Sequence, residues 1–333
     1  MRTRAAAGAL LITLPLFAGL MAPGHAGAQA VKVKMGSSLS PPAFDAFTQY
    51  VAREQGIFKK YGLDVEITEF RGDPTSTKAL LAGETDVSLM GGTAAMVTVS
   101  KGAKIRLVMV PQPVSPFHFV ARKEAATTLQ GLVGKSIAVS GIGAYSYHMP
   151  RIVLERSGVD PDKAKYLALG SPADRFKALL AGKIDATMVR NTEAAKLAKY
   201  PEIVTLAQVP KVLPEIPDNF LMAREEFIAK NPDTMYRLTR AMVEANRWIA
   251  TNKAGTVEIG RKLLKDEDPE VLAKAYDIAD PRLWGVNADI SEAAYKFTVE
   301  FLMRVGWMTE PVPYDKFYDR RFLDRVLTEL GRM

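Results

Sequence analysis

Hydrophobic and polar positions along this chain follow two periods, and each period predicts a different element. Apolar and polar residues alternate over residues 31–35 and 63–70, which predicts two strands. Apolar residues recur at helical spacing over residues 43–55, which predicts a helix. From residue 225 to residue 333 helical spacing dominates, and strand-like alternation is rare. The pattern therefore predicts an α/β body followed by a helical C-terminal extension.

Two segments of the chain are nearly identical. Residues 78–86 are Lys-Ala-Leu-Leu-Ala-Gly-Glu-Thr-Asp, and residues 177–185 are Lys-Ala-Leu-Leu-Ala-Gly-Lys-Ile-Asp. In each, the Leu pair belongs to an amphipathic helix, the Gly ends that helix, and the Asp opens a short apolar strand. A duplicated helix-strand unit predicts two similar α/β lobes, and the cleft between such lobes suits a small molecule.

Both repeats begin with a helix-start signal. Asp73 is followed by Pro74, and Ser171 is followed by Pro172. Pro is favoured at the first helical position, and Asp and Ser are favoured immediately before it. We therefore expect Asp73 and Ser171 to cap the two repeat helices.

The chain is expected to pass between the lobes twice. Extended segments at residues 117–122 and 219–223 mark the crossings, so lobe 1 would comprise residues 31–119 and 222–333, and lobe 2 residues 120–221. Two crossings form a hinge rather than a single tether, and hinge closure around a ligand is a common use of this design.

The first thirty residues differ from the rest of the chain. A basic head with Arg2 and Arg4 precedes an apolar run over residues 5–21, and small residues follow up to Ala26 and Ala30. This pattern is typical of a secretory signal peptide cleaved after one of those two alanines, and it favours a cleaved segment over a membrane anchor. We expect the mature protein to be soluble in the periplasm.

Composition narrows the chemistry. The chain of 333 residues has no Cys, which excludes disulfides, a thiol nucleophile and a thiolate metal site. Without Arg2 and Arg4 its net charge falls from +7 to +5, and its basic residues are scattered, so nucleic acid is not an expected partner. No metal or cofactor is expected, and we expect a monomer.

Signals of catalysis are sparse. Outside the signal peptide the two histidines are His118 and His148, and a structural role is favoured over a metal pair for both. The short Gly141-Ile-Gly143 sequence lacks the third glycine of a dinucleotide-binding loop.

Loops after the predicted strands carry the candidate binding residues. Ligands in open α/β sheets bind at the carboxyl ends of the strands, where helix N-termini present free N–H groups. Such donors and arginines suit an anion. The candidates are Ser38, Leu39, Ser40, Arg71, Gly91, Gly92, Thr93, Gly143, Ala144, Tyr145, Ser146, Arg190 and Asn191. Capping remains an alternative for the hydroxyls, and a solvated surface charge remains one for each arginine.

Four segments give the chain a resemblance to a known family. These are residues 54–65 (Glu-Gln-Gly-Ile-Phe-Lys-Lys-Tyr-Gly-Leu-Asp-Val), 79–86, 134–139 (Gly-Lys-Ser-Ile-Ala-Val) and 178–186. In this order they resemble the periplasmic substrate-binding proteins of ABC importers, in the nitrate, sulfonate, taurine and thiamine-precursor group. The resemblance covers about residues 31–207. It implies the type II periplasmic binding fold, in which two doubly wound α/β lobes close on a ligand that is delivered to a membrane permease.

Two departures from that group bear on the ligand. Where sulfonate-type members tend to have an aromatic-acidic-proline run, this chain has Arg190, Asn191 and Thr192, which predicts a more anionic ligand gripped by Arg190. In the lobe-2 loop, Tyr145 and Tyr147 offer either stacking on a flat ligand or core packing.

The sequence leaves two other functions open. A ligand-sensing module that presents its closed form to a membrane receptor would have the same sequence features. An enzyme similar to the fungal pyrimidine-precursor synthases of this fold is less favoured, because those proteins carry a cysteine-rich iron motif and this chain has no Cys.

Overall fold

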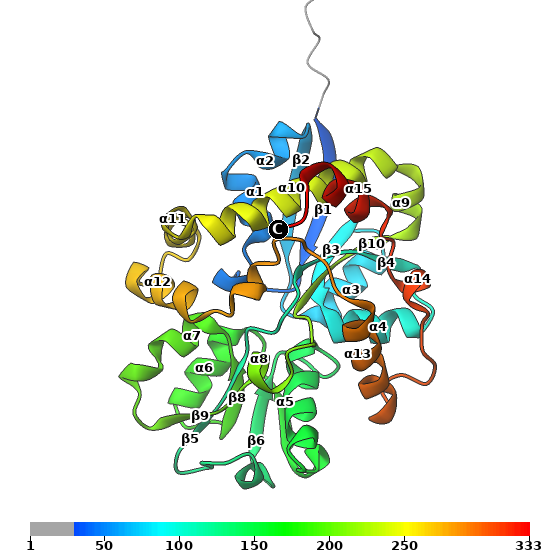
Figure 1. The fold of residues 1–333 in the computed structure, drawn as a ribbon. Coiled ribbons are helices and arrows are strands. Elements are labelled where there is room, and N and C mark those ends of the chain that lie inside the picture. Colours follow the sequence, from blue (N-terminus) through cyan, green and yellow to red (C-terminus); the bar gives the residue numbers. More distant parts are fainter. Residues whose placement is uncertain (1–29) are drawn as a thin grey trace, which may run out of the picture.

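A computed structural model describes residues 30–333, and the predicted signal peptide over residues 1–30 lies almost wholly outside the described residues. Two α/β lobes lie one above the other, and helices of the C-terminal extension pack mainly on the upper lobe (Figure 1). The expected fold, two α/β lobes of the type II periplasmic binding kind with a helical extension, is confirmed. Among residues 30–333 no helix is both long and apolar enough to cross a membrane.

Lobe 1 is built on a five-stranded sheet of order β2-β1-β3-β10-β4. Strand β1 pairs in parallel with β2 and β3, whereas β10 is antiparallel to both of its neighbours. The strands are β1 (Val31–Ser37), β2 (Leu63–Glu69), β3 (Val87–Gly91), β4 (Ile105–Gln112) and β10 (Asn219–Arg224). The accompanying helices are α1 (Thr48–Glu54), α2 (Ile57–Lys60), α3 (Asp73–Leu81) and α4 (Gly92–Ser100), with a 3-10 turn at Phe44–Ala46.

Lobe 2 repeats this arrangement with the order β7-β6-β8-β5-β9. Here β6 pairs in parallel with β7 and β8, and β5 is antiparallel to β8 and β9. The strands are β5 (His118–Arg122), β6 (Ser136–Val139), β7 (Lys165–Ala168), β8 (Ala186–Val189) and β9 (Ile203–Gln208). The helices are α5 (Tyr145–Arg156), α6 (Pro172–Leu180), α7 (Asn191–Lys196) and α8 (Val209–Val212).

The antiparallel strand of each sheet is the first strand after a crossing between the lobes. Strand β5 follows β4 through residues 113–117, and β10 follows β9 through residues 209–218. The two extended segments expected at the crossings are therefore full members of a sheet, and the chain crosses immediately before them. The edge strand β9 was not predicted, because its partly exposed residues lack the continuous apolar run of a buried strand.

The C-terminal extension is helical, as its periodicity predicts. Its helices are α9 (Glu225–Lys230), α10 (Pro232–Thr251), α11 (Lys253–Leu263), α12 (Pro269–Ile278), α13 (Glu292–Arg304), α14 (Tyr314–Phe317) and α15 (Arg321–Leu330). The buried face of α10 carries Met235, Leu238 and Met242 and packs against α1 and α15. Helix α12 contacts α7 of lobe 2, so the extension reaches both lobes.

The two repeat helices begin differently. Ser171 caps α6 as expected, since its hydroxyl accepts a hydrogen bond from the Asp174 amide. Asp73 does not cap α3. The residue before that helix is Gly72, at φ 105°, and the Asp73 carboxylate bonds elsewhere. Glycine suits this backbone conformation because it has no Cβ.

Candidate ligand-binding cleft

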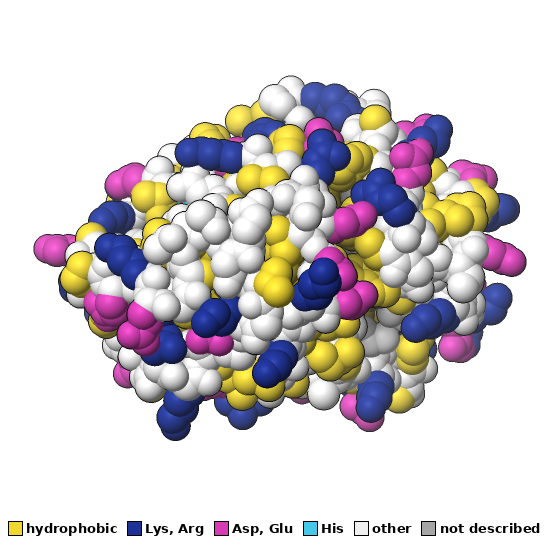
Figure 2. All heavy atoms as spheres, turned by 90° about the horizontal axis from the view of Figure 1, so that it is seen from below, with side chains coloured by type: hydrophobic (Ala, Val, Ile, Leu, Met, Phe, Trp, Pro, Cys, Tyr) yellow, Lys and Arg dark blue, Asp and Glu magenta, His cyan; other side chains and the backbone are white. Residues whose placement is uncertain are grey.

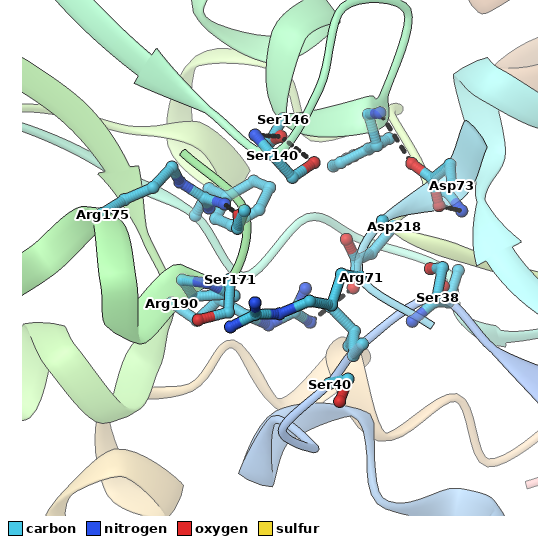
Figure 3. Close-up of a pocket in the computed structure, with 18 residues that line it drawn as sticks. Ser38, Ser40, Arg71, Asp73, Ser140, Ser146, Ser171, Arg175, Arg190 and Asp218 are labelled. Atoms are coloured by element: carbon cyan, nitrogen blue, oxygen red, sulfur yellow. Dashed lines mark hydrogen bonds and ion pairs between the residues drawn. The ribbon is translucent and has the colours of Figure 1, made fainter. Parts of the chain in front are cut away.

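A small cavity lies where the carboxyl ends of the parallel strands of both lobes meet. Its volume is about 40 Å³, and residues from both lobes line it (Figure 3). A water molecule needs about 10–15 Å³ of such cavity volume, so the cavity has room for about three groups the size of a water molecule. The cleft expected from the duplicated unit is therefore present in a closed arrangement.

The structure brings most of the predicted residues to this cavity and leaves some outside it. The predicted residues that line it are Ser38, Leu39, Ser40, Arg71, Gly91, Tyr145, Ser146 and Arg190. Those that do not are Gly92, Thr93, Gly143, Ala144 and Asn191. Lining residues that the sequence analysis missed include Asp73, Phe117, Ser140, Ser171, Arg175 and Asp218.

The predicted residues outside the cavity mostly bond within the protein. The Gly92 amide donates to the Asp218 carbonyl, and the Asn191 amide donates to Asp45. The Thr93 hydroxyl bonds to Nδ1 of His148 at 2.9 Å. Gly143 lies in the loop before α5, and the buried Ala144 is the residue immediately before that helix.

Arg190 lines the cavity as predicted for a binding residue, and it is also paired with two acids of the protein. Its side chain is 3% exposed, and its Nε and Nη2 atoms donate to Asp45 at 2.5 Å and to Asp218 at 2.6 Å. Burial alone would lower the pKa of Arg190, but the two carboxylates raise it well above its ordinary value. The forked grip expected on a ligand is thus already made with two acids of the protein.

The buried cluster of Arg190, Asp45 and Asp218 contains two acids and one base. Burial raises the pKa of Asp218 to about 6, although Arg190 acts in the opposite direction. Burial likewise raises the pKa of Glu193, in the first turn of α7, to about 6. Two carboxyl groups close to the cleft therefore titrate near neutral pH.

The carboxylate of Asp73 binds backbone amides at two helix N-termini that were expected to bind an anion. One carboxylate oxygen accepts from the Gly91 amide at 2.9 Å, before α4, and the other from the Tyr145 amide at 2.8 Å, at the start of α5. The bond to Tyr145 joins lobe 1 to lobe 2. A negative charge at two helix N-termini is favourable, and here the protein supplies that charge itself.

Arg71 lies at the exposed mouth of the cleft. Its side chain is 69% exposed and forms an ion pair with Asp174 of lobe 2 at 3.1 Å. An exposed pair of this kind contributes little to stability. It nevertheless links the two lobes, and Arg71 itself lines the cavity (Figure 3).

Arg175 is the cavity-lining cation that the sequence analysis missed. It is 1% exposed, and its guanidinium donates to the Gly170 carbonyl at 2.7 Å, the Thr187 hydroxyl at 3.3 Å and the Met188 carbonyl at 3.3 Å. The predicted binding residues all belong to loops and helix starts, whereas Arg175 lies within α6. The available signal was a charge on that helix's apolar stripe, beside Phe176 and Leu179.

The two histidines are buried and bond to uncharged side chains. His118 bonds to Asn191 at 3.1 Å, and His148, bonded to Thr93, stacks on Trp307 at a ring distance of 4.1 Å. Burial lowers the pKa of His148 to about 3. Within residues 30–333 no three His, Asp or Glu side chains are placed to hold a metal ion.

The two tyrosines of the lobe-2 loop lie in different places. Tyr145 lines the cavity and packs against Phe117, with 5.7 Å between ring centres. Tyr147 packs instead against Tyr166 and Trp307, beside the guanidinium of Arg151. Core packing therefore accounts for Tyr147, whereas Tyr145 borders the cleft.

The face of the molecule in Figure 2 shows no concentration of one sign of charge. In the face that Figure 2 shows, Lys and Arg side chains alternate with Asp and Glu side chains and with apolar patches. The scattered basic residues expected from the sequence are therefore seen on this face.

Comparisons with known proteins place the chain in a family. A putative binding protein of Bacillus subtilis, YtlA, is 24% identical over 288 residues, covering 84% of this chain and 86% of the relative. The bicarbonate-binding protein CmpA of Synechococcus sp. is 24% identical, covering 72% of this chain and 59% of its own. The structure of the periplasmic nitrate-binding protein NrtA from Synechocystis superposes with a TM-score of 0.76 at 16% identity, covering 91% and 90% of the two chains. The NMT1/THI5-like family model matches residues 44–254, and the chain belongs to that family.

Proposed function

We propose that this protein captures a small organic anion in the cleft between its lobes and delivers it to the membrane permease of an ABC importer. The relatives named above bind bicarbonate and nitrate or are called binding proteins, which bears out the predicted solute-binding role. The further proposals are that the protein is exported through a cleaved signal peptide, works as a monomer and catalyses no reaction.

One observation carries the proposal: the cavity is enclosed by polar contacts between the lobes. Asp73 of lobe 1 bonds to the Tyr145 amide, Asp45 to Arg190, and Thr93 to His148. A ligand that enters such a cleft is covered only when these contacts form, so binding and closure are coupled. The crossing segments, residues 113–117 and 209–218, are the natural hinge.

The chemistry of the cleft favours binding over catalysis. Both histidines are held by neighbouring side chains, and neither lines the cavity. Both carboxylate oxygens of Asp73 accept hydrogen bonds from backbone amides, and Arg190 forms ion pairs with two acids. Among the described cavity-lining residues we find no nucleophile hydrogen-bonded to a base, which is the arrangement that covalent catalysis needs.

Thermal unfolding across a panel of small anions tests this function. A ligand at about 100 times its dissociation constant should stabilise the protein by about 2.7 kcal/mol. The same anion should reduce the radius of gyration in small-angle scattering, because the lobes close. Mass spectrometry of the denatured protein identifies any anion that co-purifies. A flat thermal response to every anion, with unchanged scattering, would contradict the proposal.

A further inference from the structure

The position of Arg175 differs between the two otherwise similar repeats. Aligning Lys78 with Lys177 places Ser76 opposite Arg175 and Ser88 opposite Thr187. In lobe 1 the two serine hydroxyls bond to each other at 2.6 Å, and in lobe 2 Nε of Arg175 bonds to the Thr187 hydroxyl at 3.3 Å. The scaffold is thus the same, but lobe 2 carries a buried cation where lobe 1 has a neutral pair.

Among the described residues no acid lies within ion-pair distance of Arg175, although Glu193 and Asp174 act on its pKa from farther away. Its three hydrogen bonds go to two carbonyls and a hydroxyl, which leaves two of the five guanidinium N–H donors without a partner in this part of the chain. The other deeply buried arginines are paired, Arg190 with two aspartates and Arg151 with Asp162 at 2.5 Å. Burial lowers the pKa of Arg175 only to about 10, so it remains charged at neutral pH. Buried charges are ordinarily paired, so this one lacks a counter-ion.

The cavity that Arg175 lines is the place where a counter-ion could bind. Arg175 lines the cavity together with Ser140, Ser146 and Ser171, and its side chain extends from α6 toward that space (Figure 3). The other two arginines of the cavity are already paired, Arg71 with Asp174 and Arg190 with Asp45 and Asp218. Asp73 and the surplus acid beside Arg190 already place negative charge at this cavity, so one added negative charge next to Arg175 is easier to accommodate than two.

We propose that Arg175 is the residue that binds the oxyanion of the ligand, and that it selects small singly charged oxyanions such as a carboxylate or a group of nitrate size over dianions. This inference rests on the proposed function and refines its site. The cavity of about 40 Å³ supports a ligand of only a few heavy atoms in the closed arrangement. Guanidinium hydrogen bonds to such groups are directional and charge-assisted.

Titration calorimetry on the full mature chain tests the proposal. The probes are sodium formate, acetate, bicarbonate, nitrate and methanesulfonate as monoanions, and sodium sulfate as the dianion. The parent protein should bind at least one monoanion, and sulfate at least tenfold more weakly. Arg175→Met and Arg175→Gln should each weaken that monoanion ten- to a hundredfold, and Arg175→Lys should recover only part of the loss.

Arg151→Gln is the matched control, because Arg151 is also a buried lobe-2 arginine but does not line the cavity. It should change thermal stability without changing the monoanion affinity. Circular dichroism establishes that each variant is folded before titration. The selectivity of the parent for monoanions over sulfate needs no variant, so it tests the proposal even where Arg175→Met does not fold.

The outcomes separate the inference from the function beneath it. A parent protein that binds monoanions while the Arg175 variants bind them equally well would overturn the role of Arg175 and leave the proposed function intact. Sulfate binding more tightly than every monoanion would overturn the charge selection in the same way. A parent protein that binds none of the probes and carries no co-purifying anion would count against the proposed function itself.

Discussion

The two copies of the repeat have the same scaffold and differ in the charge that they place at the cleft. In each, the closing Asp accepts a bond from a backbone amide of the neighbouring strand, at Lys34 for Asp86 and at Ser136 for Asp185. Each of these acids also pairs with an arginine of the antiparallel strand, Arg224 or Arg122. Such bonds hold the sheet together, and both lobes keep them.

The difference lies at the positions that face the cleft. Lobe 2 places Arg175 and Arg190 where lobe 1 has Ser76 and Gly91. Asp45 of lobe 1 and Asp218 of the second crossing pair with Arg190, and Asp73 of lobe 1 also lines the cavity. A duplicated unit can therefore keep its fold while its two copies acquire complementary charge. Of the two lobe-2 cations, Arg190 holds the lobes together through Asp45, and Arg175 is the one that we propose binds the ligand.

Replacing Arg190 should have the largest effect on stability. Arg190→Met leaves Asp45 and Asp218 buried without their cation, and breaking a buried pair in this way costs about 3–5 kcal/mol. Urea unfolding of the ligand-free protein measures the loss. Arg175→Met removes a cation that forms no ion pair, so it should lower the free energy of unfolding clearly less than Arg190→Met does. Equal losses for the two variants would show that the two arginines are not distinguished as described.

The pH dependence of stability should come next in size. Burial raises the pKa of Asp218 to about 6, above its ordinary value near 4, so the folded protein holds a proton there that the unfolded chain releases. This contribution is fully present below about pH 4 and is lost as the pH rises to about 6. The effect on the free energy of unfolding is of the order of 3 kcal/mol.

Asp218→Asn should remove that part of the pH dependence. Unfolding free energies of the parent and of Asp218→Asn, measured from pH 4 to pH 7, should draw apart across this window and run parallel above it. A constant difference between them at every pH would mean that Asp218 does not titrate there.

Truncating the neutral pair in lobe 1 should have a smaller effect. Ser76→Ala removes the bond between the Ser76 and Ser88 hydroxyls, and a lost hydrogen bond of this kind costs about 1 kcal/mol. Because Ser76 does not line the cavity, the monoanion affinity should stay at the parent value. A loss of affinity as large as that of Arg175→Gln would remove the contrast between the two repeats.

The ion pair at the cleft mouth should matter least to stability. Arg71→Ala breaks the exposed contact with Asp174, and exposed pairs contribute about 0–1 kcal/mol. Stopped-flow measurement of anion release should show faster dissociation in Arg71→Ala if the pair helps to hold the closed form. If the anion dissociates at the parent rate, Arg71 does not help to hold the closed form and is only a solvated surface charge.

Periodicity and the repeat were sufficient to predict the architecture, whereas side-chain partners were not visible in the sequence. The repeat helices and their strands follow from Leu-Leu-Ala-Gly and the Asp that comes next, because these signals are local. The partners of Arg190 come from residues 145 and 28 positions away, Asp45 and Asp218, and no local pattern joins them. Asp73 was expected to cap its own helix for the same reason.

The missed Arg175 shows what the alignment of the two repeats offers. Its place on the buried stripe of α6 is a local signal, since Phe176 and Leu179 lie on the same face. The equivalent Ser76 shows that the scaffold needs no cation there. A charged residue on the buried stripe of only one copy is therefore a candidate for function, and the amino-acid sequence alone contains this signal.

A crystal structure of the mature protein, purified without added ligand or grown with the tightest-binding monoanion, tests the role of Arg175 most directly. We expect closed lobes with one small oxyanion in the cavity, accepting hydrogen bonds from the free N–H groups of Arg175 while Arg190 stays bonded to Asp45 and Asp218. An anion bound to Arg190 in place of its two aspartates, or seated away from Arg175, would contradict this assignment.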